Sequence, residues 1–218
     1  MPEEEIIITC SQAALNLGKF QMQPVNMEIP KGYIIGIEGK NGAGKSTFMK
    51  MLLGRYPMMS GSIRIDGLDV IKQREEMLQK VGYVAADREF YQEYDARENE
   101  KMYARFYQKW NHRLYEEMLR KYQVGKHKKY GTLSKGNQIK FQMAFALAYE
   151  PEVIIMDEPT AGLDPVFRMD FVKWLQDMVA ENGTTILISS HLHEELEKIA
   201  DYIIRIEKGL CTCEEVLS

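Results

Sequence analysis

The sequence contains no apolar run approaching the roughly 20 residues that a membrane-spanning helix needs. Its first residues, from Met1 to Glu5, are acidic and lack the basic and apolar regions of a secretory signal peptide. The chain also lacks a long basic tract, and its formal net charge of −4 argues against nucleic acid as a partner. These absences predict a protein that resides in the cytoplasm.

Cysteine is scarce as well, with only Cys10, Cys211 and Cys213. A C-x-C pair with one distant thiol does not match the ligand spacing of a structural zinc site, so reduced thiols are expected. No internal repeat, low-complexity tract or long linker is present. A chain of 218 residues, 45% of them hydrophobic, can form one large globular domain or one domain with an inserted lobe.

The most informative stretch is residues 39–47, Gly-Lys-Asn-Gly-Ala-Gly-Lys-Ser-Thr, which fits the phosphate-binding loop pattern G-x-x-x-x-G-K-[ST]. An apolar, strand-like run at Tyr33–Ile37 precedes it, and a helical pattern at Phe48–Leu53 follows and ends at Gly54. Strand, glycine-rich loop and helix are the structural context that this motif requires. A chance glycine-rich turn with both flanks correct is therefore the weaker interpretation.

Each part of this loop has an expected role in holding a nucleotide. The glycines let successive backbone N–H groups face a phosphate, and the helix N-terminus adds partial positive charge. Lys45 can reach the β- and γ-phosphates, while the Ser46 hydroxyl can bind Mg²⁺. The residues expected to contact the nucleotide are Asn41, Gly42, Ala43, Gly44, Lys45, Ser46 and Thr47.

Two acids follow a second apolar strand, Val153–Met156. At the carboxyl end of a parallel strand, such acids lie at the edge where the phosphate loop is expected. Asp157 would then orient Mg²⁺ or its waters, and Glu158 would orient or deprotonate the attacking water. Acids after a strand are often plain loop residues, but here the run Pro159–Pro165 follows and favours the catalytic interpretation.

Hydrophobic periodicity predicts an α/β protein, namely a P-loop core with a mainly parallel sheet, an N-terminal antiparallel β subdomain and an inserted helical lobe. The expected strands of the opening region are 6–9, 25–29, 60–67 and 81–84. Composition then changes, and residues 87–132 form the expected lobe, with helices at 97–110 and 114–122. The flanking segments, 1–86 and 133–218, form the nucleotide-binding core of one domain. Their later expected elements are a helix at 137–149, a helix at 165–180, a strand at 184–189, a helix at 193–200 and a strand at 202–206.

With these motifs in order, the sequence resembles the ATP-binding-cassette (ABC) ATPases over nearly its whole length. Residues 39–47 match the family's Walker A loop, and Asp157-Glu158 match Walker B with the catalytic glutamate. Leu133–Asn137 stands where the family has its signature, usually Leu-Ser-Gly-Gly-Gln. Ala161–Asp164 is similar to the D-loop, and Ser190-His191 to the switch histidine. The last two motifs are weak singly, but the ordered set is specific.

The resemblance implies ATP and Mg²⁺ as cofactors, with Lys45, Glu158 and His191 as catalytic residues and Ser46 and Asp157 at the metal. It also implies a dimer that sandwiches two ATPs. Ser134 and Gly136 open a helix whose N-terminus can hold a phosphate. In the family, this signature closes over ATP held by the other subunit's Walker A loop.

The sequence departs from the family pattern at three places. No glutamine follows the strand at Val81–Val84, where Ala86 and then Asp87 stand instead. Lys135 and Asn137 replace the usual Gly and Gln of the signature, and Lys135 is expected to face solvent. For the aromatic that stacks on adenine, Phe20 is the candidate; Asn16 or Leu17 at that place, with Phe20 as a core residue, is the alternative.

The function implied is the ATPase subunit of an ABC transporter, peripheral on the inner face of the cell membrane and acting on separate membrane subunits. Those subunits would dock on the helical lobe, whose Arg97-Glu98-Asn99 and Tyr103-Ala104-Arg105 resemble export-type cassettes for drugs and peptides. Two alternatives remain at this point. One is a non-catalytic regulatory cassette of a heterodimer, and the other is a soluble ABC ATPase not linked to transport.

Overall fold

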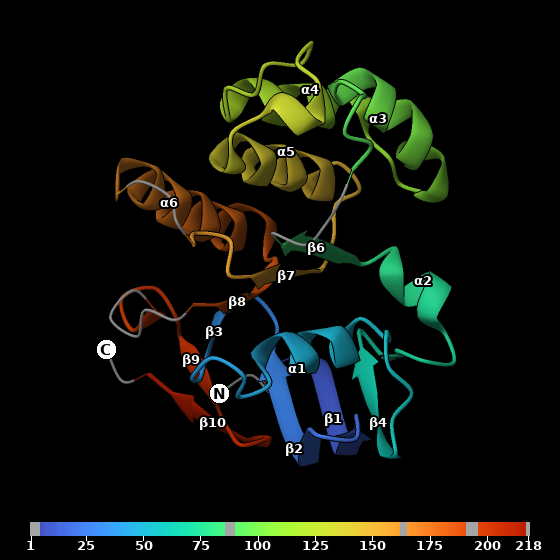
Figure 1. Cartoon of the computed structure of the whole chain (residues 1–218), viewed down its shortest axis with the longest axis vertical. Helices are drawn as coiled ribbons and strands as arrows, with labels where there is room; N and C mark the ends of the chain where they lie inside the picture. The colour runs from blue at the N-terminus through green and yellow to red at the C-terminus, as the bar shows by residue number, and fades with distance from the viewer. Residues whose placement is uncertain (1–4, 86–89, 162–164, 191–195, 217–218) are drawn as a thin grey trace.

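The computed structural model of the chain describes residues 5–85, 90–161, 165–190 and 196–216. Two β-sheets and the helices around them are stacked in layers (Figure 1). From the bottom of that view the order is an antiparallel sheet, helix α1, a mainly parallel sheet, and the remaining long helices. The predicted α/β class, with an antiparallel N-terminal region and a mainly parallel sheet, is confirmed.

The antiparallel sheet has four strands in the order β2-β1-β4-β5. These strands are β1 (Ile6–Asn16), β2 (Gln21–Pro30), β4 (Ser60–Ile65) and β5 (Leu68–Asp69). Strand β1 extends seven residues beyond the predicted end at Thr9. Its register against β2 shifts between Cys10 and Ala13, and Gln12 has a positive φ of 51°. This irregularity breaks the two-residue alternation of the sequence, which hid the second half of the strand.

The second sheet has six strands in the order β10-β9-β3-β8-β7-β6. They are β3 (Ile34–Glu38), β6 (Val81–Ala85), β7 (Val153–Asp157), β8 (Thr185–Ser189), β9 (Tyr202–Glu207) and β10 (Leu210–Glu215). All neighbours are parallel except β9 and β10. In register, Ala85 pairs with Asp157 and Asp157 pairs with Ser189, so β6, β7 and β8 end at one level.

Both faces of this parallel sheet are buried, which explains the nearly continuous apolar runs of its strands. Along β7, Val153 and Ile155 belong to the core shared with α1 (Lys45–Leu52) and the antiparallel sheet. Ile154 and Met156 belong to the core under α5 (Lys135–Leu147) and α6 (Pro165–Asn182). Helix α1 is therefore held between two sheets, and the phosphate loop that precedes it is fixed at the sheet's carboxyl edge.

The outer helices are α3 (Ala96–Tyr103) and α4 (His112–Lys121), with short 3₁₀ turns at Ala104–Phe106 and Tyr130–Thr132. The prediction of one helix from Arg97 to about Trp110 was wrong beyond Phe106. Tyr107 is extended, with φ −111° and ψ 120°, and its ring stacks on Tyr149 at 4.0 Å between centroids. Tertiary packing of the ring overrides the local helical pattern. The short helix α2 (Arg74–Leu78) was not predicted.

Helix α5 belongs to both the sheet layer and the outer helices. Its buried residues pack on β6 and on α4, and Phe145 lies among the rings of Phe90, Tyr107, Trp110 and Tyr115. Of the aromatic residues of this region, Phe90 is buried, Tyr103, Tyr107 and Trp110 pack on this cluster, and Tyr91, Tyr94 and Phe106 are exposed. The helical layer is thus joined to the sheet through one shared helix.

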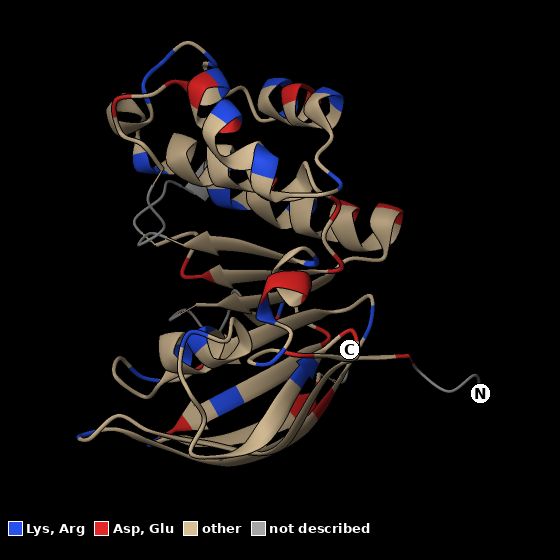
Figure 2. Cartoon of the chain, turned by 90° about the vertical axis from the view of Figure 1, so that its right-hand side faces the viewer, with Lys and Arg blue, Asp and Glu red and all other residues tan. Residues whose placement is uncertain are grey.

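Most charged residues lie on the outside of these layers. Figure 2 shows basic and acidic residues interspersed over the upper helices, whereas the central strands are mostly uncharged. In the part of the chain that the structure describes, none of the helices has the length and apolar character needed to cross a bilayer.

We expect the cap of α3 to contribute measurably to stability. The Asp95 carboxylate accepts from the backbone N–H groups of Arg97 and Glu98, and the Glu98 carboxylate accepts from the Asp95 N–H, all at 2.9 Å. Replacing Asp95 by Ala should lower the free energy of unfolding by about 0.5–2 kcal/mol, measured by urea denaturation. Arg113→Ala, at an exposed site in the first turn of α4, is the control, with an expected change within about 0.5 kcal/mol. Equal losses of unfolding free energy in Asp95→Ala and Arg113→Ala would contradict this role of the cap.

Candidate functional site

The phosphate loop reaches the N-terminus of α1 through tight backbone turns. Gly44 is the N-cap residue of α1 and has a φ of 115°, in the region that favours glycine. A side chain at Gly39 would collide with the Ile206 carbonyl, 2.5 Å from a Cβ placed there. The Ala43 N–H donates to the Lys40 carbonyl at 3.0 Å, which closes the loop into a turn.

The N-terminus of α1 has no side-chain cap. Most helices begin with a side chain that accepts a hydrogen bond from the first backbone N–H groups. Gly44 cannot supply one, and no side-chain hydrogen bond caps this end. The first N–H groups of α1 are therefore available to an anion, and the helix dipole favours one at this end.

Lys45 is the first residue of α1 and is only 5% exposed. Its Nζ donates to the Gly39 carbonyl at 2.7 Å and lies 3.6 Å from Oε1 of Glu158. The ammonium group is thus held across the mouth of the loop by one carbonyl and one carboxylate. A phosphate entering the loop would meet a positive charge already in place.

The two acids at the end of β7 are fixed by a serine from the neighbouring strand. Ser189 is fully buried at the end of β8, and its hydroxyl donates to Oδ1 of Asp157 at 2.8 Å. The Ser189 Oγ in turn accepts from the backbone N–H of Glu158 at 2.9 Å. Glu158 has a φ of 46°, an uncommon conformation for a residue with a side chain, and such backbone strain is concentrated at functional sites.

Most of the predicted site residues line one cleft of about 690 Å³. Its lining consists of Phe20, Asn41, Gly42, Gly44, Lys45, Ser46, Thr47, Lys50, Ala85, Asp157 and Glu158. Ala43 is a nearly buried residue of the loop, and together with Ser190 it lines a second hollow. The half-buried ring of Phe20 lies against the loop, since a Cβ on Gly44 would be 2.4 Å from its Cζ. The structure therefore brings this aromatic to the phosphate-loop cleft.

Ser134 and Gly136 do not line this cleft. Ser134 is the exposed N-cap residue of α5, and its hydroxyl accepts from the Asn137 N–H at 3.4 Å. His191, most of the D-loop, and Ala86 with Asp87 lie outside the described residues, as do the first three residues of the helix expected at 193–200. Within this chain, the cleft is thus formed without the signature.

Two residues of the site were not predicted from the sequence. Asp157 and Glu158 were predicted because polar residues at the carboxyl end of a parallel strand lie at the edge where ligands bind. The same rule would have predicted Ser189, which is the last residue of the apolar parallel strand β8. Lys50 lines the cleft one turn after Ser46 on α1, and the spacing of four residues on an expected helix was the available signal.

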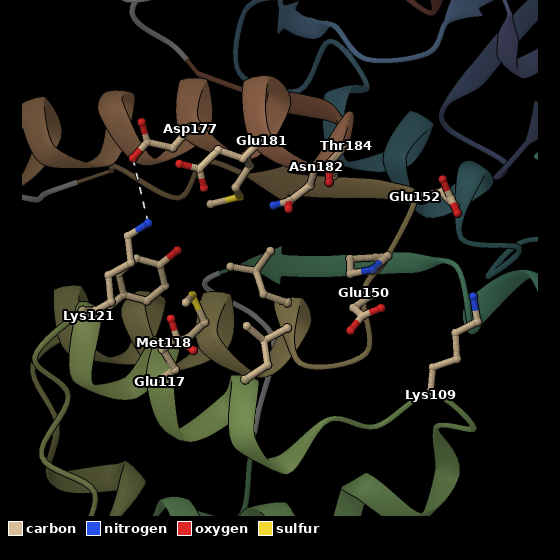
Figure 3. Close-up of a pocket in the computed structure, with 15 residues that line it drawn as sticks. Lys109, Glu117, Met118, Lys121, Glu150, Glu152, Asp177, Glu181, Asn182 and Thr184 are labelled. Atoms are coloured by element: carbon tan, nitrogen blue, oxygen red, sulfur yellow. Dashed lines mark ion pairs between the residues drawn. The ribbon is translucent and has the colours of Figure 1, made fainter.

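A second cleft, of about 480 Å³, lies between α4 and the C-terminal end of α6. Figure 3 shows Glu117 and Met118 of α4 facing Glu181 and Asn182 of α6 across it. Five carboxylates line this cleft against two lysines, and Lys121 is paired with Asp177 at 3.9 Å. This surplus of negative charge opposes the binding of a polyphosphate, whereas the loop cleft presents an ammonium group and free N–H groups.

The oxygen donors of the loop cleft suit Mg²⁺. The Ser46 hydroxyl and the Asp157 carboxylate are hard ligands, and both residues line the cleft. Among the described residues there is no cluster of three His, Cys, Asp or Glu side chains that could hold a metal alone. The residues therefore fit Mg²⁺ that arrives with nucleotide phosphates and keeps part of its water shell.

Together, the parallel sheet, the loop and the uncapped helix define a P-loop nucleotide-binding protein. The family model described as "ABC transporter" matches residues 22–161, and the chain belongs to that family.

Curated relatives from bacteria agree with this assignment. The chain is 35% identical over 189 residues to the bacitracin transport ATP-binding protein BcrA of Enterococcus faecalis, covering 85% of this chain and 61% of BcrA. It is 32% identical over 195 residues to the ABC transporter ATP-binding protein YtrB of Bacillus subtilis, covering 89% of this chain and 66% of YtrB. The chain thus spans less than two thirds of the length of these two relatives.

Solved structures share the fold. CbiO1 of Clostridium perfringens, described as part of the ABC transporter complex CbiONQ, has a TM-score of 0.83 at 25% identity, covering 98% of this chain and 89% of CbiO1. The ATP-binding cassette MJ0796, solved as a dimer in a post-hydrolysis state with ADP and Pi, has a TM-score of 0.83 at 22% identity, covering 97% of this chain and 100% of that one.

Gly44→Ala should weaken ATP binding. The added Cβ would displace the Phe20 ring and force Ala into a left-handed conformation, which costs about 1–2 kcal/mol. We expect the Kd for ATP, measured with a fluorescent analogue, to rise by about tenfold or more, which corresponds to 1.4 kcal/mol. Gly18→Ala is a matched control, because Gly18 has a φ of 72° and no atom within 4 Å of an added Cβ. The same Kd in both variants would contradict the proposed geometry.

Proposed function

We propose that this chain binds and hydrolyses ATP and that the cycle drives transport through separate membrane subunits. The observation that carries the proposal is the convergence of Lys45, Ser46, Asp157 and Glu158 on one cleft beside the uncapped N-terminus of α1. Membership of the ABC transporter family supports the link to transport.

Nucleotide binding would use groups that are already in position. The N–H groups of Gly42 and of residues 44–47 would donate to the phosphates, and Lys45 would exchange its contact with Glu158 for the γ-phosphate. Phe20 would stack on the adenine from the side of the loop. Ser46 and Asp157 would hold Mg²⁺, which neutralises charge on the phosphates when it is bound.

Hydrolysis would depend on Glu158. Its backbone is fixed by Ser189, so the carboxylate projects from the end of β7 toward the phosphate loop. Once Lys45 moves to the phosphate, the carboxylate can accept a proton from a water in line with the γ-phosphorus. His191 would complete the catalytic set, as the family pattern implies.

We infer that two cassettes close over two ATPs. Ser134 and Gly136 lie at the exposed N-terminus of α5 and outside this chain's own loop cleft, which supports their use in trans. The dimeric state of MJ0796 is a precedent on the same fold. ATP shifts the equilibrium toward the closed dimer because it makes its additional contacts only there.

The membrane subunits would dock on the helical lobe, where Tyr91 and Phe106 are exposed by 46% and 62%. The similarity to BcrA, a bacitracin transport ATP-binding protein, supports a cassette of the drug- and peptide-transport type. We propose export as the direction of transport, with the chain at the inner face of the cell membrane. Co-purification from membranes, followed by identification of the bound chains, tests the docking and the membrane location. A soluble complex without any membrane chain would favour a cassette not linked to transport.

Glu158→Gln tests the catalytic assignment and the alternative of a non-catalytic cassette. Glutamine keeps the shape of the side chain but cannot take the proton, so steady-state ATPase should fall by about 10²–10⁴-fold. ATP binding should persist, and a closed dimer should accumulate in size-exclusion chromatography with ATP and Mg²⁺. Glu152→Gln removes a carboxylate before the other end of β7, and its turnover should stay near wild type. If the ATPase activity of Glu158→Gln stayed within about threefold of wild type, far from the general-base range, the catalytic role of Glu158 would be contradicted.

Mixing two inactive variants tests action in trans. Lys45→Ala removes the charge that binds the terminal phosphates, and Ser134→Arg fills the phosphate site that the signature offers to the facing subunit. In a mixed dimer, one composite site carries both defects and the other carries neither. We therefore expect each variant alone to be inactive and their mixture to regain part of the ATPase activity. Mixed dimers that form but regain no activity would count against two independent composite sites.

A further inference from the structure

Gln142 is a buried polar residue on a helix whose buried face is otherwise apolar. It is 1% exposed, and the other buried residues of α5 are Ile139, Phe141, Met143, Ala144, Phe145, Ala146 and Leu147. Burying an amide group without hydrogen-bond partners is unfavourable. Its hydrogen bonds therefore explain how the residue is tolerated at this place.

One of these bonds reaches the nucleotide cleft. Oε1 of Gln142 accepts from the backbone N–H of Ala85 at 2.9 Å. Ala85 is the last residue of β6, lines the cleft, and pairs in register with Asp157 of β7. Strand β6 is the edge of the six-stranded sheet, so a side chain from α5 fixes the end of the strand where another strand would otherwise lie.

The second bond reaches the outer helical layer. Nε2 of Gln142 donates to the hydroxyl of Tyr130 at 3.0 Å, and Tyr130 is itself 2% exposed. The Tyr130 ring packs against Phe90 and Phe141, and its backbone N–H donates to the Tyr94 carbonyl at 2.8 Å. One side chain therefore connects the end of β6, helix α5 and the segment that leads into Ser134.

We propose that Gln142 is a positioning residue that couples the phosphate cleft to the helix bearing Ser134. This inference rests on the proposed function. A change at the end of β6 or β7 on ATP binding is transmitted through Ala85 to α5, and through Tyr130 to the segment before Ser134. The two bonds set the orientation of the signature relative to the chain's own cleft, which a dimer with two composite sites requires.

The same strand and the same helical segment supply a control. The Tyr149 hydroxyl, just beyond α5, donates to the Val81 carbonyl at 3.1 Å, at the opposite end of β6. Tyr149→Phe deletes one buried hydrogen bond between this segment and β6, but far from the cleft. A purely structural role of Gln142 predicts that its loss resembles this control.

The experiment compares Gln142→Met, Tyr130→Phe and Tyr149→Phe in the full chain, with ATP as the probe. For Gln142→Met we expect kcat to fall about 10- to 100-fold, the size of effect that a small misplacement remote from the chemistry can cause. The Kd for ATP should stay within about twofold, because the loss acts on the transition state. Tyr130→Phe keeps the bond between Gln142 and Ala85, so its kcat should fall less than that of Gln142→Met. The double variant with Gln142→Met and Tyr130→Phe should have a kcat no lower than that of Gln142→Met alone.

Hydrogen exchange separates this inference from the proposed function. In wild type, ATP with Mg²⁺ should slow exchange in peptides covering residues 126–134, and Gln142→Met should abolish that response while Tyr149→Phe keeps it. Equal kcat losses in Gln142→Met and Tyr149→Phe, or an unchanged exchange response in Gln142→Met, would overturn the coupling role. A wild-type chain that binds ATP without turnover would contradict the proposed function, and the exchange response alone would then decide the inference.

Discussion

The parallel register of β6, β7 and β8 is the constraint on which the rest of the site depends. It places Ala85, Asp157 and Ser189 at one level of the carboxyl edge. Ser189 can then bind Asp157 and the Glu158 backbone together, and the phosphate loop from β3 meets the acids of β7 across one cleft. A shift of one residue would turn each side chain to the opposite face and separate these groups.

The charge and burial of groups in the same site suit a phosphate. Lys45 is almost fully buried, and its Nζ has a carbonyl and a carboxylate as partners, as a buried polar group requires. The cleft between α4 and α6 is lined by more carboxylates than lysines, and this surplus of negative charge disfavours a phosphate. The helical layer is joined to this chemistry through α5, which has Ser134 at one end and contacts β6 along its length.

Much of the fold and the centre of the site could be predicted from the sequence, because local patterns encode them. The loop glycines, the strands before each motif and the helix stop at Gly183 are readable one segment at a time. Strand β10 was missed although Lys208 and Gly209, both with positive φ, form a two-residue turn that a hairpin requires. The end of the helix after Arg97 could not be read, because it depends on the stacking of Tyr107 on Tyr149.

The sequence by itself determined the family, the phosphate loop and the identity of the acids, since residue type and spacing along one chain specify them. Only the tertiary structure decided that Ser189 fixes both acids, that Phe20 lies against the loop, and that Gln142 connects the cleft with the outer helices. These contacts join residues that are 12 to 57 positions apart in the chain. No local pattern specifies such pairs, because only the packing of the sheet and its helices brings them within hydrogen-bonding distance.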